Sequence, residues 1–394
     1  MSTMVSEGAA ELLRMIAGSR TETRASIAHD TGWARGTVNA RLDELLDLGL
    51  VIDVGATGGS RGRPAARFAF EPTAGSLLVA DVGASAARFA HCDLRGAVLS
   101  QHEAPIDIAA GPETVLDTVV AELGRLPSRD QVPAWALGVS LPGPIEHPSG
   151  RVVSPPIMTG WDGLEVPRVL EPRVGVPVLV ENDVNAMAWG EVVSTGRMRD
   201  LLFLKVGTGV GAGIVVNGAL LRGAQGAAGD LGHTHVGDAG PGRQPLCRCG
   251  KRGCVEAYAG GWAMARDLTE AGLEVETAGD VVERVLAGDP LAVDRVREAG
   301  RVLGGAIASA VSLVNPAEIV VGGQLSDVGD HLLAGMRERV AAYALPLATR
   351  DLVIRTSSRP QDAGLIGLVD TMTRWALEPG RLGEVLSRVG APQD

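Results

Sequence analysis

Hydrophobic residues near the N-terminus recur at helical spacing in three short segments. Residues 6–18 and 34–48 each place apolar side chains on one side of a helix, and residues 23–32 form a shorter segment that stops at Gly32. In the third segment the apolar positions fall at i, i+4 and i+7, and they are Val38, Leu42 and Leu45. The pattern predicts three helices that bury these faces together.

Two strand-like segments follow, and their spacing predicts a β-hairpin. LVIDV at 50–54 and ARFAF at 66–70 flank the stretch GATGGSRGRPA, which contains Arg61 and Arg63 but no acid. Helix, turn, a helix with small and basic residues on its free face, and then a hairpin are the parts of a winged helix-turn-helix domain. We assign residues 1–70 to such a DNA-binding domain.

Beyond this head, strand and helix patterns alternate, which indicates an α/β fold. The expected strands lie within 77–100, 136–140, 178–182, 201–221 and 318–326, and the expected helices are 111–126, 183–195, most of 262–312, 328–343 and 362–377. The stretch 201–221 repeats the strand, glycine turn and strand of 77–90. We therefore expect residues 77–394 to form a body of two similar lobes with a cleft between them. Residues 71–76, EPTAGS, are the expected linker.

Composition and charge fit this division. A chain of 394 residues with 45% hydrophobic residues can bury the cores of two or three domains. The net charge of −11 is uneven, because residues 1–70 contain eight arginines and eight acids and sum to zero. The acidic body alone would argue against a nucleic-acid partner, but a neutral head with a local basic patch does not. The sequence shows neither an apolar run of membrane-spanning length nor a signal peptide, so we expect a cytoplasmic protein with no membrane partner.

Candidate zinc ligands cluster in the stretch 226–258. Cys247, Cys249 and Cys254 lie within eight residues, and His233 precedes them. One imidazole and three thiolates are a common set for a structural zinc ion. A disulfide cluster is the alternative, but it needs an oxidising compartment. His235 is the alternative histidine ligand.

Candidate DNA contacts lie in the third helix and in the hairpin tip. Arg35, Thr37, Asn39 and Arg41 fall outside the apolar face of residues 34–48, where a recognition helix would present them to the major groove. Arg61 and Arg63 sit in the segment RGRP, which could follow a narrow minor groove. The alternative is a protein-binding three-helix module with a solvated basic loop.

Glycine-rich turns are the candidate phosphate sites. GTGVGAG at 207–213 nominally matches a dinucleotide motif, but β-branched residues follow it directly, so we expect a hairpin instead of a strand and helix. The amides of such a turn can still cradle phosphate, and a tight turn without any ligand is the alternative. The candidates here are Gly207, Thr208 and Gly209, and a second glycine turn offers Gly322 and Gly323.

Taken together, these segments resemble the ROK family, which groups bacterial repressors and sugar kinases of the actin-like, hexokinase-type fold. The resemblance covers about residues 8–377. It is carried by C-x-C-G-x-x-G-C-x-E at 247–256, ENDVNA at 181–186, GVSLPGP at 138–144 and the glycine hairpin. The head and its RGRP segment resemble the repressor branch, since the stand-alone kinases of the family begin near residue 77.

The resemblance implies a sugar site. Asn182, Asp183, Glu256 and His233 are expected to bind sugar hydroxyls, with the second ring nitrogen of His233 on zinc. Asp183 would be the general base if the protein were a kinase. Asp230 stands where the family has glutamate, so it reaches about one methylene less and its sugar contact differs.

The first phosphate loop departs from the family pattern D-x-G-G-T-K. Asp81, Gly83 and Ser85 keep parts of it, but Ala84 and Ala86 bring a methyl group and no charge. Ile157 also stands where the family often has asparagine. These departures put ATP binding and phosphoryl transfer in doubt.

The sequence thus predicts a sugar-responsive DNA-binding transcriptional regulator, most often a repressor in this family, with a structural zinc ion. Its expected partners are a double-stranded DNA operator, a monosaccharide and further copies of the chain in a homodimer or homotetramer. The alternative is an ATP-dependent hexose or N-acetylhexosamine kinase that uses Mg-ATP, alone or together with regulation. A regulator whose effector is a protein is a third interpretation.

Overall fold

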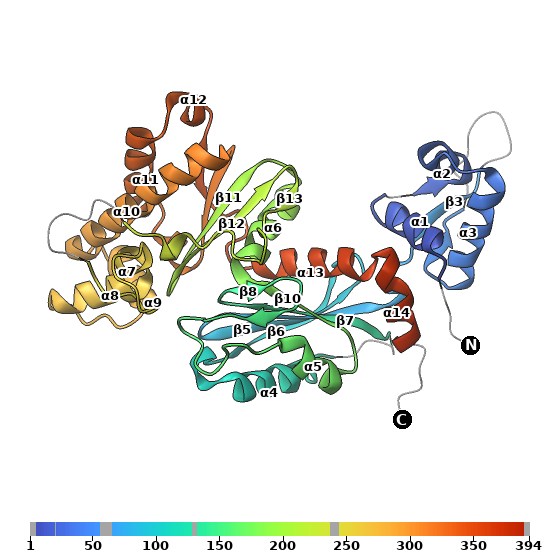
Figure 1. Cartoon of the computed structure of the whole chain (residues 1–394), viewed down its shortest axis with the longest axis horizontal. Coiled ribbons are helices and arrows are strands. Elements are labelled where there is room, and N and C mark those ends of the chain that lie inside the picture. The colour runs from blue at the N-terminus through green and yellow to red at the C-terminus, as the bar shows by residue number, and fades with distance from the viewer. Residues whose placement is uncertain (1–4, 20, 56–64, 128–131, 237–243, 390–394) are drawn as a thin grey trace.

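The structure is a computed structural model that describes residues 5–19, 21–55, 65–127, 132–236 and 244–389. It contains an N-terminal unit at one end and a two-lobed α/β body (Figure 1). The N-terminal unit has helices α1 (Glu7–Ala17), α2 (Arg24–Thr31) and α3 (Arg35–Asp47), and strands β1 (Glu22–Thr23), β2 (Val51–Asp53) and β3 (Arg67–Phe70). The strands form one sheet in the order β1-β3-β2. All three predicted helices and both predicted strands are present.

Local sequence signals explain where these helices begin and end. The Thr23 hydroxyl accepts from the backbone of Ser26, and the Ser26 hydroxyl accepts from the Thr23 N–H, so α2 starts with a capping box. Gly32 ends α2 in the left-handed region at φ 68°. The predicted RGRP segment with Arg61 and Arg63 lies outside the described residues.

The expected linker at 71–76 is ordered and hydrogen-bonded at both ends. The Glu71 N–H donates to the Leu50 carbonyl, and the Leu94 N–H donates to the Pro72 carbonyl. Residues Pro72–Ala74 form a 3-10 turn, and Ser76 is already the first residue of strand β4 (Ser76–Val82). The segment expected to be the linker is thus a short structured connection, whose backbone groups pair with both neighbouring units.

The first lobe is built on a five-stranded sheet in the order β10-β7-β4-β5-β6. Its elements are β4, β5 (Ala86–Asp93), β6 (Val98–Pro105), β7 (Ala134–Leu141) and β10 (Val178–Asn182), with helices α4 (Pro112–Leu123), α5 (Val166–Val174), α13 (Ala363–Ala376) and α14 (Pro379–Val389). A short two-stranded ribbon, β8 (Ile145–Glu146) and β9 (Arg151–Val152), lies beside it. Helices α4 and α5 cover one face of the sheet and α13 covers the other (Figure 1).

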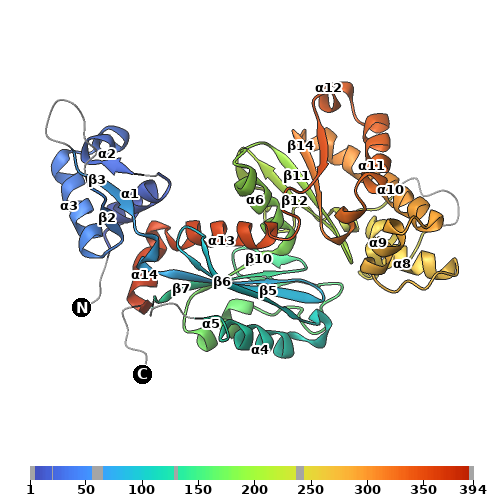
Figure 2. The ribbon, with the colours of Figure 1, turned by 180° about the vertical axis from the view of Figure 1, so that it is seen from behind.

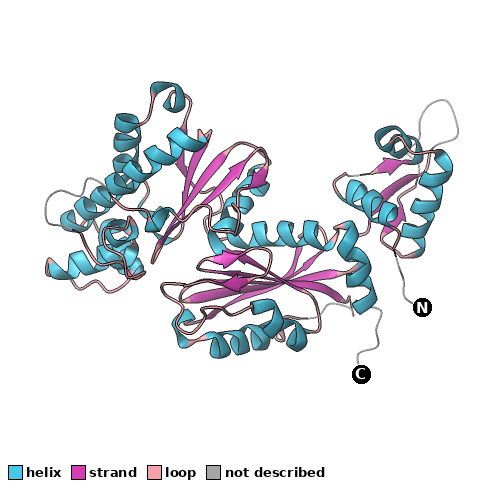
Figure 3. Cartoon of the chain, viewed as in Figure 1, coloured by secondary structure: helices cyan, strands magenta, loops and turns pink. Residues whose placement is uncertain are grey.

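The second lobe repeats this topology. Its sheet has the order β13-β12-β11-β14-β15, in which three antiparallel strands are followed by two parallel ones, as in the first lobe. The strands are β11 (Leu201–Val206), β12 (Val210–Val216), β13 (Ala219–Leu220), β14 (Glu318–Gly322) and β15 (Val353–Thr356). The helices are α7 (Glu256–Ala259), α8 (Gly261–Glu270), α9 (Ala278–Leu286), α10 (Pro290–Val314), α11 (Asp330–Tyr343) and α12 (Pro346–Thr349). The two similar lobes expected from the sequence are confirmed, and Figure 3 shows the two sheets.

Helix α6 (Asp183–Thr195) joins the lobes. It packs against the second sheet through Val184, Ala188 and Val192, and its other side crosses α13. A Cβ at Gly190 would lie 1.8 Å from the Ala363 carbonyl oxygen, so only glycine permits this approach. Seen from behind, α13 lies between the first sheet and α6 (Figure 2).

The sequence analysis missed α5, α14 and β15, and it also missed the short elements β1, β8, β9, α7 and α12. Pro172 lies inside α5, and the four residues of β15 have no clean alternation of burial, so neither has a strong signal. Within the described residues no helix is long and apolar enough to cross a bilayer.

The crossing of α6 and α13 yields a stability prediction. Gly190→Ala places a methyl group against backbone that cannot move aside, so we expect the free energy of unfolding to fall by about 2–3 kcal/mol. Gly305→Ala, in the middle of α10 with open space around its Cβ, is the matched control and should raise it by about 0.5–1 kcal/mol. Urea unfolding followed by circular dichroism measures both. Equal effects would refute the close crossing.

Candidate functional site

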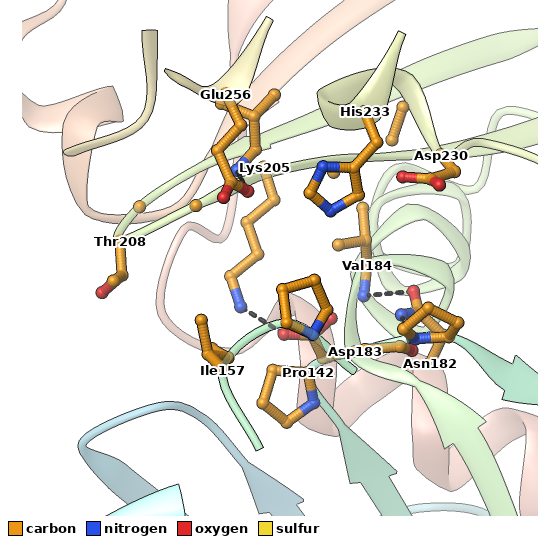
Figure 4. Close-up of a pocket in the computed structure, with 18 of the residues that line it drawn as sticks. Pro142, Ile157, Asn182, Asp183, Val184, Lys205, Thr208, Asp230, His233 and Glu256 are labelled. Carbon is orange, nitrogen blue, oxygen red and sulfur yellow. Dashed lines mark hydrogen bonds and ion pairs between the residues drawn. The ribbon is translucent and has the colours of Figure 1, made fainter. Parts of the chain in front are cut away.

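A cavity of about 290 Å³ lies between the two lobes, near the lower end of the range for small-molecule sites. The first lobe contributes the loops after β4 and β7, and the second contributes the turn between β11 and β12 and the loop that follows β13. The sugar candidates Asn182, Asp183, Asp230, His233 and Glu256 all line it (Figure 4). Residues that lie far apart in the sequence thus meet in one place.

Asn182 and Asp183 occupy the start of α6. The Asn182 side-chain oxygen accepts from the N–H groups of Val184 and Asn185 at 3.0 and 3.1 Å, which makes it the N-cap of the helix. Its Nδ2 donates to the Gly143 carbonyl at 2.9 Å. Most of the Asn182 side chain therefore holds the loop and helix together, with one N–H still available to a ligand.

Asp183 has a partner that the sequence analysis missed. The ammonium of Lys205, near the end of β11, donates to the Asp183 carboxylate (Figure 4). Burial alone would lower the pKa of Lys205, but Asp183 and Asp81 together raise it above its ordinary value. The ammonium therefore stays charged at neutral pH. An ion pair between the two lobes thus stands beside the cavity.

Glu256 is fixed by two donors on its cavity side. Its Oε2 accepts from the Val210 N–H at 3.0 Å, and its Oε1 accepts from the Trp262 indole at 3.2 Å. A Cβ at Gly209 would lie 2.5 Å from Oε2, so the glycine turn is needed for the carboxylate to come this close. Glu256 is buried, and its spare lone pairs can accept hydroxyl groups.

The cysteines and His233 form a compact group. One ligand atom from each of His233, Cys247, Cys249 and Cys254 lies within 4.8 Å of the others. The Cys249 and Cys254 sulfurs are 3.7 Å apart, and Nδ1 of His233 is 3.7 Å from the Cys247 sulfur. A tetrahedron with Zn–S bonds of about 2.3 Å has sulfur–sulfur edges of about 3.8 Å, so this donor set fits a zinc ion.

The positions of His233 and His235 decide which of them can belong to the cysteine cluster. His235 lies in an isolated bridge with Cys254, and its ring packs against Gly253, where a Cβ would lie 2.8 Å from Nε2. It is not among the clustered ligand atoms. His233 lines the cavity while its Nδ1 faces the cysteines, so Nε2 is the nitrogen left for a ligand. The exposed Asp230 lies beside it (Figure 4).

The first-loop residues divide between two environments. Ala84 and Ser85 line the cavity, whereas the Asp81 carboxylate accepts from the Ser140 hydroxyl at 2.5 Å and lies against Gly364 of α13. Burial raises the pKa of Asp81 above its ordinary value, although the Ser140 hydroxyl and Lys205 act in the opposite direction. The Gly83 N–H closes its own turn by donating to the Ala86 carbonyl.

The other glycine turns are used largely for packing. The expected hairpin at 207–213 is present, and the Gly207 N–H donates to the Gly209 carbonyl. The carbonyls of Gly207 and Thr208 accept from the first residues of α8. Gly207, Thr208 and Gly209 line the cavity, whereas Gly322 and Gly323 pack closely on Phe203 and Val206. Their neighbour Gln324 lines the cavity instead.

The candidate DNA contacts on α3 differ in exposure. Arg35 and Asn39 are exposed and Thr37 is half-buried. The Arg41 guanidinium lies 4.7 Å over the Trp33 ring, in the place that a Cβ at Gly8 would occupy. Arg41 therefore packs α3 against α1. The periodicity of the sequence had instead predicted that it lies on the free face of the helix.

Known proteins resemble this chain over most of its length. A sequence profile described as the ROK family matches residues 78–374. The xylose repressor of Caldicellulosiruptor bescii is 26% identical, over 91% of this chain and 93% of its own length. The glucokinase of Halalkalibacterium halodurans is 33% identical, over 73% of this chain and 92% of its own length. The crystal structure of a ROK family transcriptional regulator, a homologue of the E. coli MLC protein, is 25% identical with a TM-score of 0.79, and the match covers 98% of both chains.

The cysteine cluster yields a metal prediction. Purified protein should contain about one zinc ion per chain, and Cys254→Ser should lose most of it because a tetrahedral structural site needs all four ligands. Cys92→Ala, which removes the buried cysteine outside the cluster, should keep it. Plasma mass spectrometry of gel-filtered protein gives the zinc content. Full zinc content in Cys254→Ser would refute the assignment.

Proposed function

The chain belongs to the ROK family, and on that premise we propose that it is a sugar-responsive, DNA-binding transcriptional regulator, most simply a repressor of carbohydrate metabolism. In this proposal residues 1–70 are a winged helix-turn-helix domain, 71–76 connect it, and 77–394 form the sugar-binding body. The effector is a monosaccharide, and the His233 and cysteine cluster holds a structural zinc ion.

The observation that carries the proposal is the presence of the N-terminal unit on a kinase-like body. The family profile begins at residue 78, and the glucokinase relative covers 73% of the chain, whereas the xylose repressor relative covers 91%. The difference in coverage, 18% of 394 residues, is about the size of the unit of three helices and a small sheet that precedes the family profile. In that unit α3 leaves Arg35 and Asn39 exposed near its N-terminus, where a recognition helix contacts bases.

The cavity supplies what recognition of a sugar requires. Asp183, Glu256 and Nε2 of His233 offer acceptors and donors at fixed positions, and a ligand lacking a matching hydroxyl would leave them unpaired. The zinc ion would fix the loop that carries His233 and, through Cys254, the start of α7 with Glu256. Metal and sugar sites therefore share one histidine but have separate roles.

A continuous packed route connects the cavity with the N-terminal unit. Helix α6 begins at Asp183 in the cavity and crosses α13, which leads into α14, and α14 packs against α1. Leu368 of α13 and Leu382 of α14 belong to the same buried cluster as Leu12 of α1. A shift of α6 on sugar binding can therefore move the N-terminal unit, and in a homodimer or homotetramer it would change the spacing of two recognition helices.

Two observations favour the kinase alternative. Asp183 lines the cavity, and some relatives of the chain are named glucokinase. Against it stand Ala84 in the first loop and Asp81, which is turned toward α13 and Ser140. Residues that would hold Mg-ATP are thus only partly in place. We therefore rank regulation first.

A gel-shift experiment tests the function. The full chain should retard DNA from upstream of its own gene, and D-xylose or another monosaccharide should weaken the complex by about tenfold or more, since effector coupling is typically 1–3 kcal/mol. A scrambled DNA of equal length is the control. Failure to bind any palindromic upstream sequence specifically would end the proposal.

Substitutions on α3 test which residues contact DNA. Asn39→Ala and Arg35→Ala should each lower specific affinity by about 1–3 kcal/mol if they contact base edges. Arg14→Ala, which changes another exposed arginine, on α1, is the matched control and should change affinity little. Fluorescence anisotropy at one salt concentration measures all three. An Arg14→Ala effect as large as that of Arg35→Ala would show only a diffuse charge effect.

A further inference from the structure

Lys205 is the residue at the cavity that the proposed function leaves unexplained. It and Lys251 are the only lysines in the sequence, whose other basic residues are all arginines. Lys251 is exposed, whereas the Lys205 side chain is 26% exposed and that of Asp183 is 6% exposed. Where this chain uses arginine at nearly all of its basic positions, the lysine here places a compact charge on an unbranched side chain beside the cavity.

The strands around Lys205 leave room for that stem. Its partner residues on the two neighbouring strands are Gly211 of β12 and Gly322 of β14. A Cβ at Gly323 would lie 3.1 Å from the Lys205 Cγ. The lysine thus crosses a strip of glycines to reach Asp183 on the other side of the cavity (Figure 4).

The ammonium changes what Asp183 can do. One carboxylate oxygen is taken by Lys205, and the other remains for a hydroxyl group. A general base must accept a proton, and a proton on Asp183 would remove the carboxylate charge with which the partly buried Lys205 ammonium is paired, leaving Asp81 as its acidic neighbour. A carboxylate held in this way is a strong acceptor of hydrogen bonds but a poor site for proton transfer.

The charges around the cavity also restrict the ligand. Asp183, Asp230 and Glu256 line it, against Lys205 and Arg248. Arg248 lies 4.9 Å over the Trp262 ring, and Lys205 is already paired. A phosphate dianion would therefore meet a surplus of negative charge, whereas an uncharged sugar would not.

We propose that Lys205 is a positioning residue that presents Asp183 to an uncharged sugar as a fixed hydrogen-bond acceptor and prevents it from acting as a base. The inference deepens the proposed function and rests on it. It makes the cavity a receptor from which the sugar leaves chemically unchanged.

Calorimetric titration of the full chain with D-glucose and D-xylose tests this. The wild-type chain should bind at least one of them. Lys205→Met should bind that sugar at least about tenfold more weakly, because losing a well-placed hydrogen bond to a charged group raises the dissociation constant by about this factor. Lys251→Met is the matched control and should bind like the wild type. In an Asp183→Asn background, Lys205→Met should change affinity by less than about twofold, because its effect acts through Asp183.

The same set of proteins separates the possible failures. Equal sugar affinity in the wild type and Lys205→Met, or an equal loss with and without Asp183, overturns the inference while leaving the regulator intact. Tighter binding of glucose 6-phosphate than of glucose also overturns it. If the wild type binds no sugar, the effector part of the proposed function fails, and the inference fails with it.

Two further measurements complete the test. Lys205→Met leaves a buried carboxylate unpaired, which can destabilise the fold. Operator binding without sugar shows whether the variant is folded. The Lys205→Met/Asp183→Asn double variant serves as a second form, in which no unpaired charge is left. ADP release by the wild type with Mg-ATP and glucose should not exceed that without sugar. Glucose-dependent release that is abolished by Asp183→Asn would overturn the inference, because Asp183 would then be working as a base.

Discussion

The close crossing of α6 and α13 is the constraint on which the arrangement of the site depends. It brings Gly190 against the Ala363 carbonyl and Gly367 against the Ala186 carbonyl, so each helix has a glycine where the other's backbone approaches. Hydrogen bonds and an ion pair from side chains of α6 also stabilise the contact. Glu191 of α6 accepts from Arg355 and Ser357, which precede α13 in the chain, and the Trp189 indole donates to Asp370 of α13. Because α6 begins inside the cavity, the same contacts that hold the lobes together also fix the direction of Asp183.

Two ion pairs cross between the lobes near that helix start, and their acidic residues lie on either side of Asn182. Lys205 holds Asp183, and Arg222 holds Glu181, whose other oxygen accepts from Asn185. Arg222 lies in the loop that leads to Asp230 and His233, so this loop is tied to the start of α6 through the buried Glu181 carboxylate. Removing one partner of such a pair is costly, since it leaves a charge in a poorly solvated place. The lobes therefore have a preferred relative position that a ligand in the cavity can alter only by changing these contacts.

Sequence patterns were sufficient for features that are local or strictly spaced. The helix 183–195, the glycine hairpin at 207–213 and the cysteine spacing at 247–254 each carry their signal within a few residues, and all three were found. Features that depend on tertiary contacts were missed. Arg41 is polar and lies outside the apolar face of α3, yet it packs on Trp33 because α1 has a glycine opposite it. Asp81 matches a phosphate-loop aspartate in the sequence, but the direction of its side chain is decided by Ser140 and α13, which lie far away in the chain.

Lys205 is the instructive case among these, because its position in an otherwise apolar strand gave no functional signal. A kinase and a receptor for the same sugar can share every residue that contacts the hydroxyl groups, so the identity of Asp183 does not distinguish them. In our proposal the distinction lies in the charge that is paired with that carboxylate. In this chain the neighbouring charge arrives from the opposite lobe, across a strip of glycines that only the paired strands of β11, β12 and β14 bring together. We therefore propose that Lys205, and not the residues that would contact the sugar hydroxyls, keeps Asp183 of this chain from acting as a base.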